Sequence, residues 1–402
     1  MSRLFNDAKD ITDNMRILMI SDVYFPRING VSTSIQTFAH EFTQRGHQVT
    51  LIAPDYDQPA PEEPFTLIRL PSRYLPFDPE DRIMRWGFLK AHHANFAADG
   101  YDLVHIHTPF IAHYVGLALA RRLRVPVVES YHTFFEHYLE QYVPLVPGAW
   151  LRWVARRFAR AQCDDVDALA IPSQAMREVL HSYGVETRAE VIPTGINLQQ
   201  FSHGDGARFR QRYGIAPERP LLIHVGRLAF EKNIEFLLRM VLQVIAQQPD
   251  LLFAIAGEGP ARRSLEALAH QLGIEQQVLF VGYLARDGSL EDCYCAGDVF
   301  VFASRTETQG LVVLESMALG TPVVSTAVMG TQEVLSAGEG CLIATEDETD
   351  FAQQTLRVLQ DRTLRQRLSV SGRQYAQNWS APVLATRMLD FYGRVIDRHG
   401  EH

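Results

Sequence analysis

The sequence predicts an α/β protein with two doubly wound parallel-sheet domains that face each other across a cleft. Short apolar runs alternate with longer stretches of helical periodicity from Arg16 onward. Continuous apolar runs separated by helices are typical of parallel strands buried on both faces. This alternation breaks once, over residues 191–220, where Pro, Gly and polar residues cluster. The break predicts the connection between the two domains.

Each predicted domain contains its own series of strands. The expected strands are RILMIS, QVTLIAP, DLVHIHT, VPVVES and DALAIPS in the first series, and LLIHVGR, LFAIAGEG, VLFVGY, DVFVFAS, TPVVST and CLIAT in the second. The expected boundaries are an N-terminal extension over 1–14, a first domain over 15–200, a second over 201–378, and a C-terminal helix over 379–402. The apolar spacing of that last segment suits a helix that crosses back and packs on the first domain.

Composition narrows the classes of function. The 402-residue chain has a net charge of -9, which provides no overall positive field for nucleic acid. Its four cysteines are too few for a disulfide framework, so we expect a protein of a reducing cytoplasm. The first fourteen residues show no export signal, and no run of 18 apolar residues occurs, so we expect no membrane span.

The strongest chemical signal is SRTETQGLVVLESMALGTPVV, residues 304–324. A helix that begins at about Leu311 places Glu315 one turn into the helix and leaves Glu307 in the loop before it. Gly310 precedes the helix, where unpaired N–H groups and the helix dipole favour a phosphate. We expect both carboxylates to project into the cleft, with Glu307 and Glu315 binding hydroxyl groups and the N–H groups of Gly310 and Leu311 binding phosphate.

A second signal is HVGRLAFEKN, residues 224–233. A predicted strand ends in Gly226, and Arg227 and Lys232 follow on the loop that leads to the next helix. Ligands of such sheets bind at the carboxyl ends of strands, where two cations stabilise a leaving diphosphate. Lys232 is also one of only three lysines in an arginine-rich chain.

The first domain contributes two further candidates. In SDVYFPRINGVSTSIQTF, Asn29 and Gly30 precede a helix whose backbone is accessible to phosphate. In ESYHTFFEHYLEQYVP, His132 directly follows a predicted strand. Its place at the carboxyl end of that strand favours a functional role over a structural one.

Several patterns are interpreted as structural. Glycines 257 and 259 form half of a dinucleotide fingerprint, but Arg262 occupies the third glycine position, which argues against a dehydrogenase. Asp165 and Asp167 form a DxD pattern, yet Asp167 opens a strand as Asp298 does in the second domain. His105 and His107 share one face of a strand without a third ligand nearby, and Cys293 and Cys295 lack a second pair. We therefore expect no metal site and no cofactor.

Residues 15 to about 395 resemble the retaining glycosyltransferases of family 4, which have the GT-B fold of two facing Rossmann-like domains. The resemblance rests on four short motifs. They are the Glu307 to Glu315 pair with Gly310 and Leu311, the Gly226, Arg227 and Lys232 element, the Asn29, Gly30 and Val31 loop, and the Tyr131, His132 and Thr133 phrase.

The resemblance implies metal-independent transfer from a nucleotide sugar with retention of configuration. It implies that Arg227 and Lys232 hold the diphosphate, Glu307 the donor sugar and Glu315 the ribose. Gly30 then contacts phosphate, and His132 belongs to the surroundings of the reacting sugar. The acceptor hydroxyl attacks from the face that the diphosphate leaves, so no protein nucleophile is required.

The acceptor is suggested by two stretches of the first domain that mix arginine with aromatic residues, 134–162 and 82–93. Such helices suit the surface of an anionic membrane, although a helix packed on its own sheet would also be apolar. The phrases YFPRINGVSTSIQTF and YHTFFEHYLEQYVP are also similar to the branch that glycosylates diacylglycerol, including monoglucosyl diacylglycerol and sulfoquinovosyl diacylglycerol synthases.

The sequence thus predicts a cytoplasmic enzyme, peripheral on the inner face of the cell membrane, that moves a hexosyl group from a nucleotide sugar, preferably UDP-hexose, to a lipid hydroxyl. One alternative is GDP-mannose-dependent transfer to phosphatidylinositol or a glycan. Two others are a non-catalytic nucleotide-sugar-binding protein and an epimerase of the same fold that acts on UDP-sugars without an acceptor.

Overall fold

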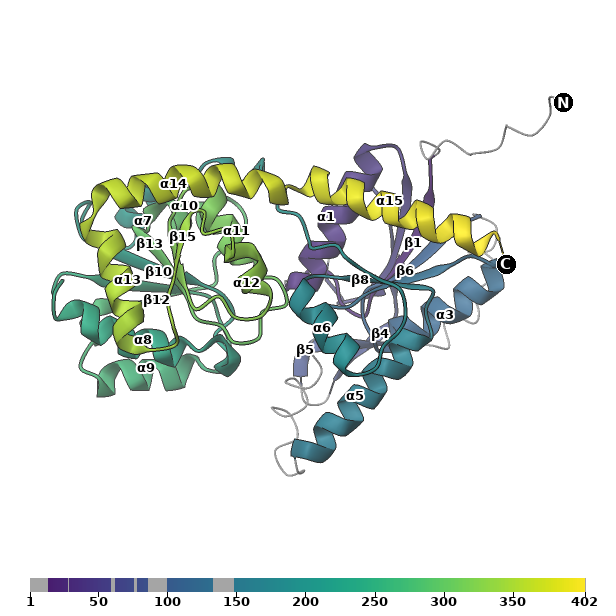
Figure 1. The fold of residues 1–402 in the computed structure, drawn as a ribbon, viewed down its shortest axis with the longest axis horizontal. Helices are drawn as coiled ribbons and strands as arrows, with labels where there is room; N and C mark the ends of the chain where they lie inside the picture. The colour runs from purple at the N-terminus through teal and green to yellow at the C-terminus, as the bar shows by residue number, and fades with distance from the viewer. Residues whose placement is uncertain are drawn as a thin grey trace. The chain divides into compact units, whose positions relative to one another are not determined.

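The computed structural model describes residues 14–27, 29–58, 62–75, 78–85, 100–132 and 148–401 (Figure 1). The chain divides into two compact units. Unit 1 comprises Met1–Gly195 and Ala381–His402, and unit 2 comprises Ile196–Ser380. The units divide after residues 195 and 380, whereas the boundaries predicted from the sequence lie after residues 200 and 378.

Unit 1 contains a parallel sheet with the strand order β3-β2-β1-β6-β7-β8-β9 and a separate antiparallel β4-β5 pair. The strands are β1 (Arg16–Ile20), β2 (Gln48–Pro54), β3 (Thr66–Leu70), β4 (Ser72–Leu75), β5 (Asp78–Met84), β6 (Leu103–Ile106), β7 (Val127–Ser130), β8 (Ala168–Ile171) and β9 (Ala189–Val191). The helices are α1 (Gly30–Gln44), α3 (Ile111–Leu123), α5 (Gly148–Asp164), α6 (Gln174–Ser182) and α15 (Ala381–His399).

The C-terminal helix α15 packs on α1 within unit 1. The Arg45 guanidinium, at the end of α1, donates to the Thr386 hydroxyl at 2.8 Å and to the Pro382 carbonyl at 2.5 Å. The rings of Phe42 and Tyr392 meet edge to face with their centroids 5.7 Å apart. The expectation that this helix returns to the first domain is confirmed.

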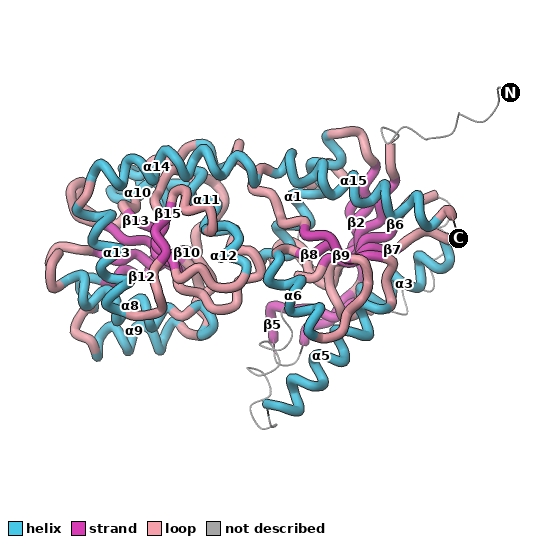
Figure 2. Tube along the Cα trace, viewed as in Figure 1, coloured by secondary structure: helices cyan, strands magenta, loops and turns pink. Residues whose placement is uncertain are grey.

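Unit 2 is built on a second parallel sheet, with the order β12-β11-β10-β13-β14-β15 (Figure 2). Its strands are β10 (Leu221–Val225), β11 (Leu252–Ala256), β12 (Val278–Gly282), β13 (Val299–Phe302), β14 (Val323–Ser325) and β15 (Cys341–Ile343). Its helices are α7 (Gly206–Arg212), α8 (Ile234–Ile245), α9 (Arg262–Gln271), α10 (Ser289–Ala296), α11 (Leu311–Ala318), α12 (Gly330–Leu335), α13 (Glu348–Gln360) and α14 (Arg362–Ala376), with short 3-10 helices η1 (Gln200–Ser202), η2 (Phe230–Lys232), η3 (Glu275–Gln277) and η4 (Gln377–Trp379).

The apolar run of β10 is continuous because both faces of the strand are covered. Leu222 belongs to a core cluster that includes residues of α8, α9 and α13, whereas Leu221 and Ile223 belong to another cluster with residues of α7, α10 and α11. Alternate strand residues point to opposite faces of a sheet. The doubly wound α/β prediction is therefore confirmed.

Strands β3, β9, β4 and β5 were not predicted. β3 and β9 lie at the two edges of the unit 1 sheet, and most of their residues are only half-buried. An edge strand needs no continuous apolar run, and β9 has only three residues. The periodicity of these segments therefore gave no signal.

Two aspartates tie neighbouring strands together at their starts. Asp167 accepts a hydrogen bond from the Val127 backbone N–H at 2.7 Å. Asp298 plays the same part in unit 2, accepting from the Leu221 N–H at 3.0 Å. This pairing supports the structural interpretation of the DxD pattern.

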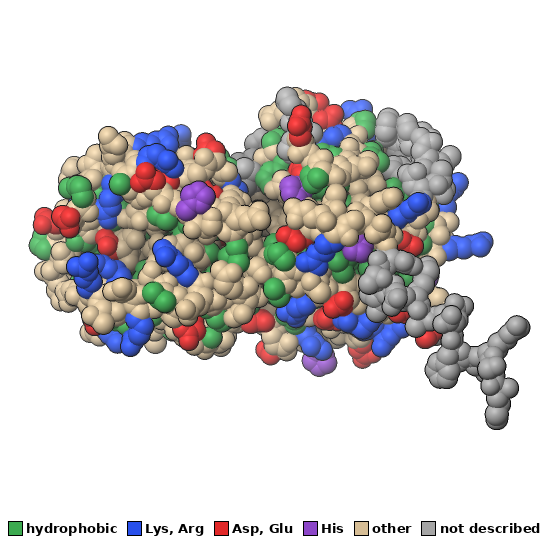
Figure 3. Space-filling view, turned by 90° about the horizontal axis from the view of Figure 1, so that it is seen from above, with side chains coloured by type: hydrophobic (Ala, Val, Ile, Leu, Met, Phe, Trp, Pro, Cys, Tyr) green, Lys and Arg blue, Asp and Glu red, His purple; other side chains and the backbone are tan. Residues whose placement is uncertain are grey.

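Charged side chains of both signs are interspersed over the face shown in Figure 3. Within the part of the chain that the structure describes, no helix is long and apolar enough to cross a membrane. The four cysteines are free thiols.

Candidate active site

In unit 2, two of the predicted motifs meet at the carboxyl ends of adjacent strands. β10 pairs with β13, so the loop from Gly226 to Lys232 and the loop that contains Glu307 begin at the same edge of the sheet. The Lys232 ammonium donates a hydrogen bond to Oε1 of Glu307, and the two side chains are 20% and 17% exposed. Arg227 lies exposed on the first of these loops. The structure therefore places Lys232, expected to bind the diphosphate, beside Glu307, expected to bind the sugar.

Backbone hydrogen bonds hold the loop of Glu307 in place. The Arg305 N–H donates to the Glu231 carbonyl at 3.2 Å, which ties this loop to the 3-10 helix that contains Lys232. The Gly330 N–H donates to the Glu307 carbonyl at 2.8 Å. A Cβ on Gly330 would lie 2.1 Å from the Thr308 carbonyl oxygen, so only glycine permits this approach.

Helix α11 begins at Leu311, as predicted, with Gly310 immediately before it. The φ of Gly310 is +86°, and a Cβ there would lie 2.6 Å from Cγ2 of Thr331. Protein geometry alone thus requires this glycine, independently of any phosphate. No side chain caps the helix, which leaves its first backbone N–H groups at the end of the loop that contains Glu307.

Glu315 is buried rather than open to solvent, with 2% of the residue exposed. Its Oε1 accepts from the Arg286 guanidinium at 3.0 Å, and its Oε2 accepts from the Tyr294 hydroxyl at 2.8 Å. Burial, followed by the neighbouring Glu315 carboxylate, raises the pKa of Tyr294 well above its usual range. Tyr294 therefore stays protonated and donates. Contact between Glu315 and a ribose remains a prediction.

Sequence reasoning missed His224, which lies on β10, near enough to Lys232 and Glu307 for their charges to act on it. Its Nδ1 lies 3.1 Å from the Val301 carbonyl oxygen, and its ring stacks on Phe302 at 5.7 Å. Burial lowers its pKa to about 4, so the imidazole is neutral near pH 7. A Cβ on Gly226 would lie 3.4 Å from Nε2 of His224.

Arg286 and Tyr294 were also missed, because nothing in their local sequence distinguishes them. Their role depends on the packing of α10 and the preceding loop against α11. The only available signal was the apolar run around Glu315, because an acid buried in such a helix requires some donor to satisfy its carboxylate.

Glycines 257 and 259 have a structural explanation. A Cβ on Gly257 would lie 1.8 Å from the Gly226 carbonyl oxygen, and one on Gly259 would lie 2.4 Å from that of Leu228. The two glycines let the loop after β11 approach the loop after β10.

In unit 1, Gly30 is the first residue of α1. Asn29 caps this helix by accepting from the Ser32 N–H at 2.8 Å. A Cβ at Gly30 would meet no heavy atom of the described residues within 4 Å, and its φ is not in the left-handed region. The fold itself therefore does not require glycine at this position.

His132 follows β7 and is half-buried. Burial lowers its pKa to about 4, which keeps the imidazole neutral. Its ring lies parallel to that of His107, with the centroids 5.8 Å apart. Thr133, the next residue of the predicted motif, lies outside the described residues.

The structure describes only parts of the two arginine-rich stretches, 134–162 and 82–93. Residues 134–147 and 86–93 lie outside the described residues. In the described remainder, α5 exposes Trp150 and Trp153 by 56% and 59%. Arg82, the first residue of the second stretch, lies on β5 and is buried. Its guanidinium donates to Asp57 at 2.9 Å and lies over the Tyr74 ring.

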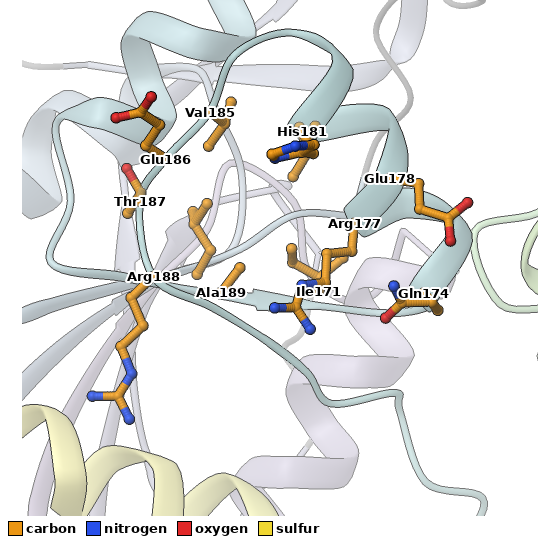
Figure 4. Close-up of a pocket in the computed structure, with 12 residues that line it drawn as sticks. Ile171, Gln174, Arg177, Glu178, His181, Val185, Glu186, Thr187, Arg188 and Ala189 are labelled. Atoms are coloured by element: carbon orange, nitrogen blue, oxygen red, sulfur yellow. The ribbon is translucent and has the colours of Figure 1, made fainter.

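Two further features of the described residues lie apart from these motifs. No group of three or more His, Cys, Asp or Glu side chains among them is arranged to hold a metal ion. A cavity of about 810 Å³ opens in unit 1 between β8, α6 and the loop before β9 (Figure 4). None of the candidate site residues lines it.

Comparison with known proteins assigns both units. Residues 28–200 match the family "Glycosyltransferase Family 4", and residues 205–375 match "Glycosyl transferases group 1". The chain is 34% identical to the alpha-monoglucosyldiacylglycerol synthase of Streptococcus pneumoniae over 77% of its own length and 71% of that protein.

Solved structures share the fold. Sucrose-phosphate synthase from Thermosynechococcus elongatus superposes with a TM-score of 0.79 at 24% identity, covering 96% of this chain and all of that one. The Anabaena protein HepE in complex with UDP-glucose has a TM-score of 0.73 at 19% identity, covering 95% of this chain and 100% of HepE. With the two doubly wound units and the matched families, the chain belongs to the glycosyltransferases of family 4, which have the GT-B fold.

Proposed function

We propose that this protein is a retaining glycosyltransferase that moves a hexosyl group from UDP-hexose to a hydroxyl group of a lipid, with diacylglycerol as the preferred acceptor. The observation that carries the proposal is the Lys232–Glu307 pair at the carboxyl ends of β10 and β13. It places a cation and a hydrogen-bond acceptor beside the uncapped start of α11.

The donor half of the chemistry belongs to unit 2. The Lys232 ammonium and the Arg227 guanidinium neutralise the diphosphate, and backbone N–H groups at Gly310 and Leu311 bind its oxygens. Glu307 then accepts from a hydroxyl of the sugar. Charge on the departing diphosphate is greatest in the transition state, so these groups accelerate cleavage of the glycosidic bond.

The reaction needs no protein nucleophile. The acceptor oxygen forms a bond to the anomeric carbon as the bond from that carbon to the diphosphate oxygen breaks. The acceptor proton passes to the departing phosphate on the same face of the sugar, and the configuration is retained. The neutral imidazole of His132 serves this step as a polar neighbour of the sugar, not as a cation.

Two observations support the choice of substrates. The relative from Streptococcus pneumoniae is named for a diacylglycerol product, which favours a lipid acceptor. HepE, with the same fold, binds UDP-glucose, which favours a UDP-sugar. The exposed Trp150 and Trp153 of α5 favour a position at a membrane surface, where such an acceptor resides. We propose that this is the cytoplasmic side of the membrane.

The decisive experiment incubates the purified protein with UDP-glucose, UDP-galactose or GDP-mannose and vesicles containing dioleoylglycerol. We expect release of UDP and an α-linked hexosyl lipid, identified by its anomeric proton coupling, and loss of both with Glu307→Ala. A β-linked product would overturn retention, and transfer only from GDP-mannose would overturn the donor. Conversion of the UDP-sugar without an acceptor would identify an epimerase, and binding without turnover would identify a non-catalytic protein.

A further inference from the structure

Unit 1 contains a column of three imidazole rings that the proposed chemistry uses only at one end. His105 and His107 lie two residues apart on and just after β6, so their side chains share one face of the sheet. Their ring centroids are 3.9 Å apart, and the two rings are tilted by 43°. The ring of His107 is nearly parallel to that of His132, with an interplanar angle of 13° and the centroids 5.8 Å apart.

The far end of the column is anchored by two hydroxyl groups. Nε2 of His105 lies 2.9 Å from the Ser130 hydroxyl, and its Nδ1 lies 2.5 Å from the Tyr392 hydroxyl. Burial raises the pKa of Tyr392 well above its usual range, so its hydroxyl keeps its proton and remains available to donate. With both nitrogens engaged by hydroxyl groups, which can donate or accept, the plane of the His105 ring is fixed.

The middle ring is buried and neutral. His107 is 1% exposed, and neither of its nitrogens has a hydrogen-bond partner among the described residues. Burial, followed by the neighbouring His105 and His132 rings, lowers its pKa well below the usual range. What His107 contributes to its surroundings is therefore the face of its ring.

We infer that His107 is a positioning residue: packed against the tilted ring of His105 and stacked on His132, it fixes the ring plane of His132 at the carboxyl end of β7. This inference rests on the proposed role of His132 beside the reacting sugar. Nε2 of His132 has no hydrogen-bond partner among the described residues, so no hydrogen bond from this atom holds the ring in place. Stacking on His107 restricts the orientation of the His132 ring instead. Because misplacing a reactive-site group costs rate more than substrate affinity, the effect should appear in kcat.

The test is a double-mutant cycle with steady-state kinetics. We expect His107→Ala to lower kcat about tenfold with an unchanged KM for the nucleotide sugar. His107→Phe keeps a ring of similar shape and should stay within about threefold of the parent kcat. In a His132→Ala background, His107→Ala should cause no further loss, because the residue acts through His132. A further loss of kcat when His107→Ala is added to His132→Ala would overturn the inference. So would a His107→Phe variant as slow as His107→Ala.

The anchor provides a second arm with a matched control. Tyr392→Phe removes the hydroxyl that holds His105 and should lower kcat in the same sense as His107→Ala. Tyr101→Phe removes a hydroxyl of unit 1 that contacts Thr50 at 3.1 Å, away from the column, and should leave kcat unchanged. Equal effects of the two variants would count against the anchor.

Side-chain NMR of labelled histidine separates this inference from the proposed function. The His132 imidazole signals should shift or broaden in His107→Ala and remain near their original positions in His107→Phe. Should the parent protein transfer no sugar, the proposed function fails while these signals still test the column. Identical His132 signals in all three proteins would overturn the positioning role even in an active enzyme.

Discussion

The Lys232 ammonium donates a hydrogen bond to the Glu307 carboxylate across 75 residues of sequence. The pair is only partly exposed and joins the loops that follow β10 and β13. In this arrangement, the cation expected to bind phosphate and the acid expected to bind sugar neutralise each other. A donor that engages both groups replaces their mutual contact with contacts to itself.

Lys232→Ala should therefore reduce turnover strongly with little effect on folding. Loss of a cation that stabilises a leaving group costs about 10²-fold or more in kcat. Loss of one partly exposed ion pair costs only about 1 kcal/mol of stability. Kinetics and urea unfolding measure the two effects. Arg262→Ala, which removes a surface cation paired with Glu258 and Glu266, is the control and should change neither. An active Lys232→Ala enzyme would exclude Lys232 from the site.

Glu315→Ala, unlike Lys232→Ala, should lower the stability of the protein strongly. The substitution leaves the Arg286 guanidinium and the buried Tyr294 hydroxyl without their acceptor. Removing one member of a buried charged pair costs about 3 kcal/mol. Glu266→Ala, at an exposed carboxylate of the same unit, should be nearly neutral. A Glu315→Ala protein with the parent urea midpoint would show that the network contributes no stability.

The contrast between Glu307 and Glu315 shows how much of the site could be predicted from the sequence. The start of α11 at Leu311 and the places of Lys232 and Glu307 on loops after strands follow from strand ends and helical spacing, which are local signals. The contact between Lys232 and Glu307 was not predicted. The partners of Glu315 do not follow from such signals, because Arg286 and Tyr294 reach it through tertiary packing. The strands with continuous apolar runs were predictable for the same reason, whereas the half-buried edge strands β3 and β9 were not.

The two glycines expected at phosphate should respond differently to alanine. At Gly310, φ is +86° and a Cβ would clash with Thr331, so Gly310→Ala should lower stability by about 1–2 kcal/mol or more. At Gly30, a Cβ meets no atom within 4 Å in the part of the chain that the structure describes, so Gly30→Ala should fold normally. It should nevertheless lower kcat/KM for the donor if phosphate approaches this backbone. Parent-like kinetics of Gly30→Ala would remove Gly30 from the site.

Acid should destabilise the protein partly through His224. Burial lowers the pKa of His224 from 6.5 to about 4. Between these values the unfolded chain takes up a proton that the folded protein does not, so stability is lost as the pH falls from 6.5 toward 4. Each such group contributes up to about 1.4 kcal/mol per pH unit. His224→Phe removes this contribution, so its stability relative to the parent should improve by about 2 kcal/mol between pH 6.5 and 5. Parallel stability curves in urea unfolding would contradict the buried neutral state of His224.

Helix α5 should bring the protein to anionic membranes. Trp150, Trp153 and Arg157 recur at i, i+3 and i+7, on the side of the helix opposite the buried Ala155 and Ala159. Tryptophan partitions into the interface between lipid and water, and arginine is attracted to anionic headgroups.

Flotation with phosphatidylglycerol vesicles should recover the protein at low salt, and recovery should fall with added salt as the charges are screened. Trp150→Ala combined with Trp153→Ala should abolish flotation without altering turnover of a detergent-dispersed acceptor. Tyr283→Ala, which removes an aromatic ring of unit 2 with 55% of the residue exposed, is the matched control and should float like the parent. Flotation that survives loss of both tryptophans would place the membrane contact elsewhere on the protein, because α5 would then contribute nothing to it.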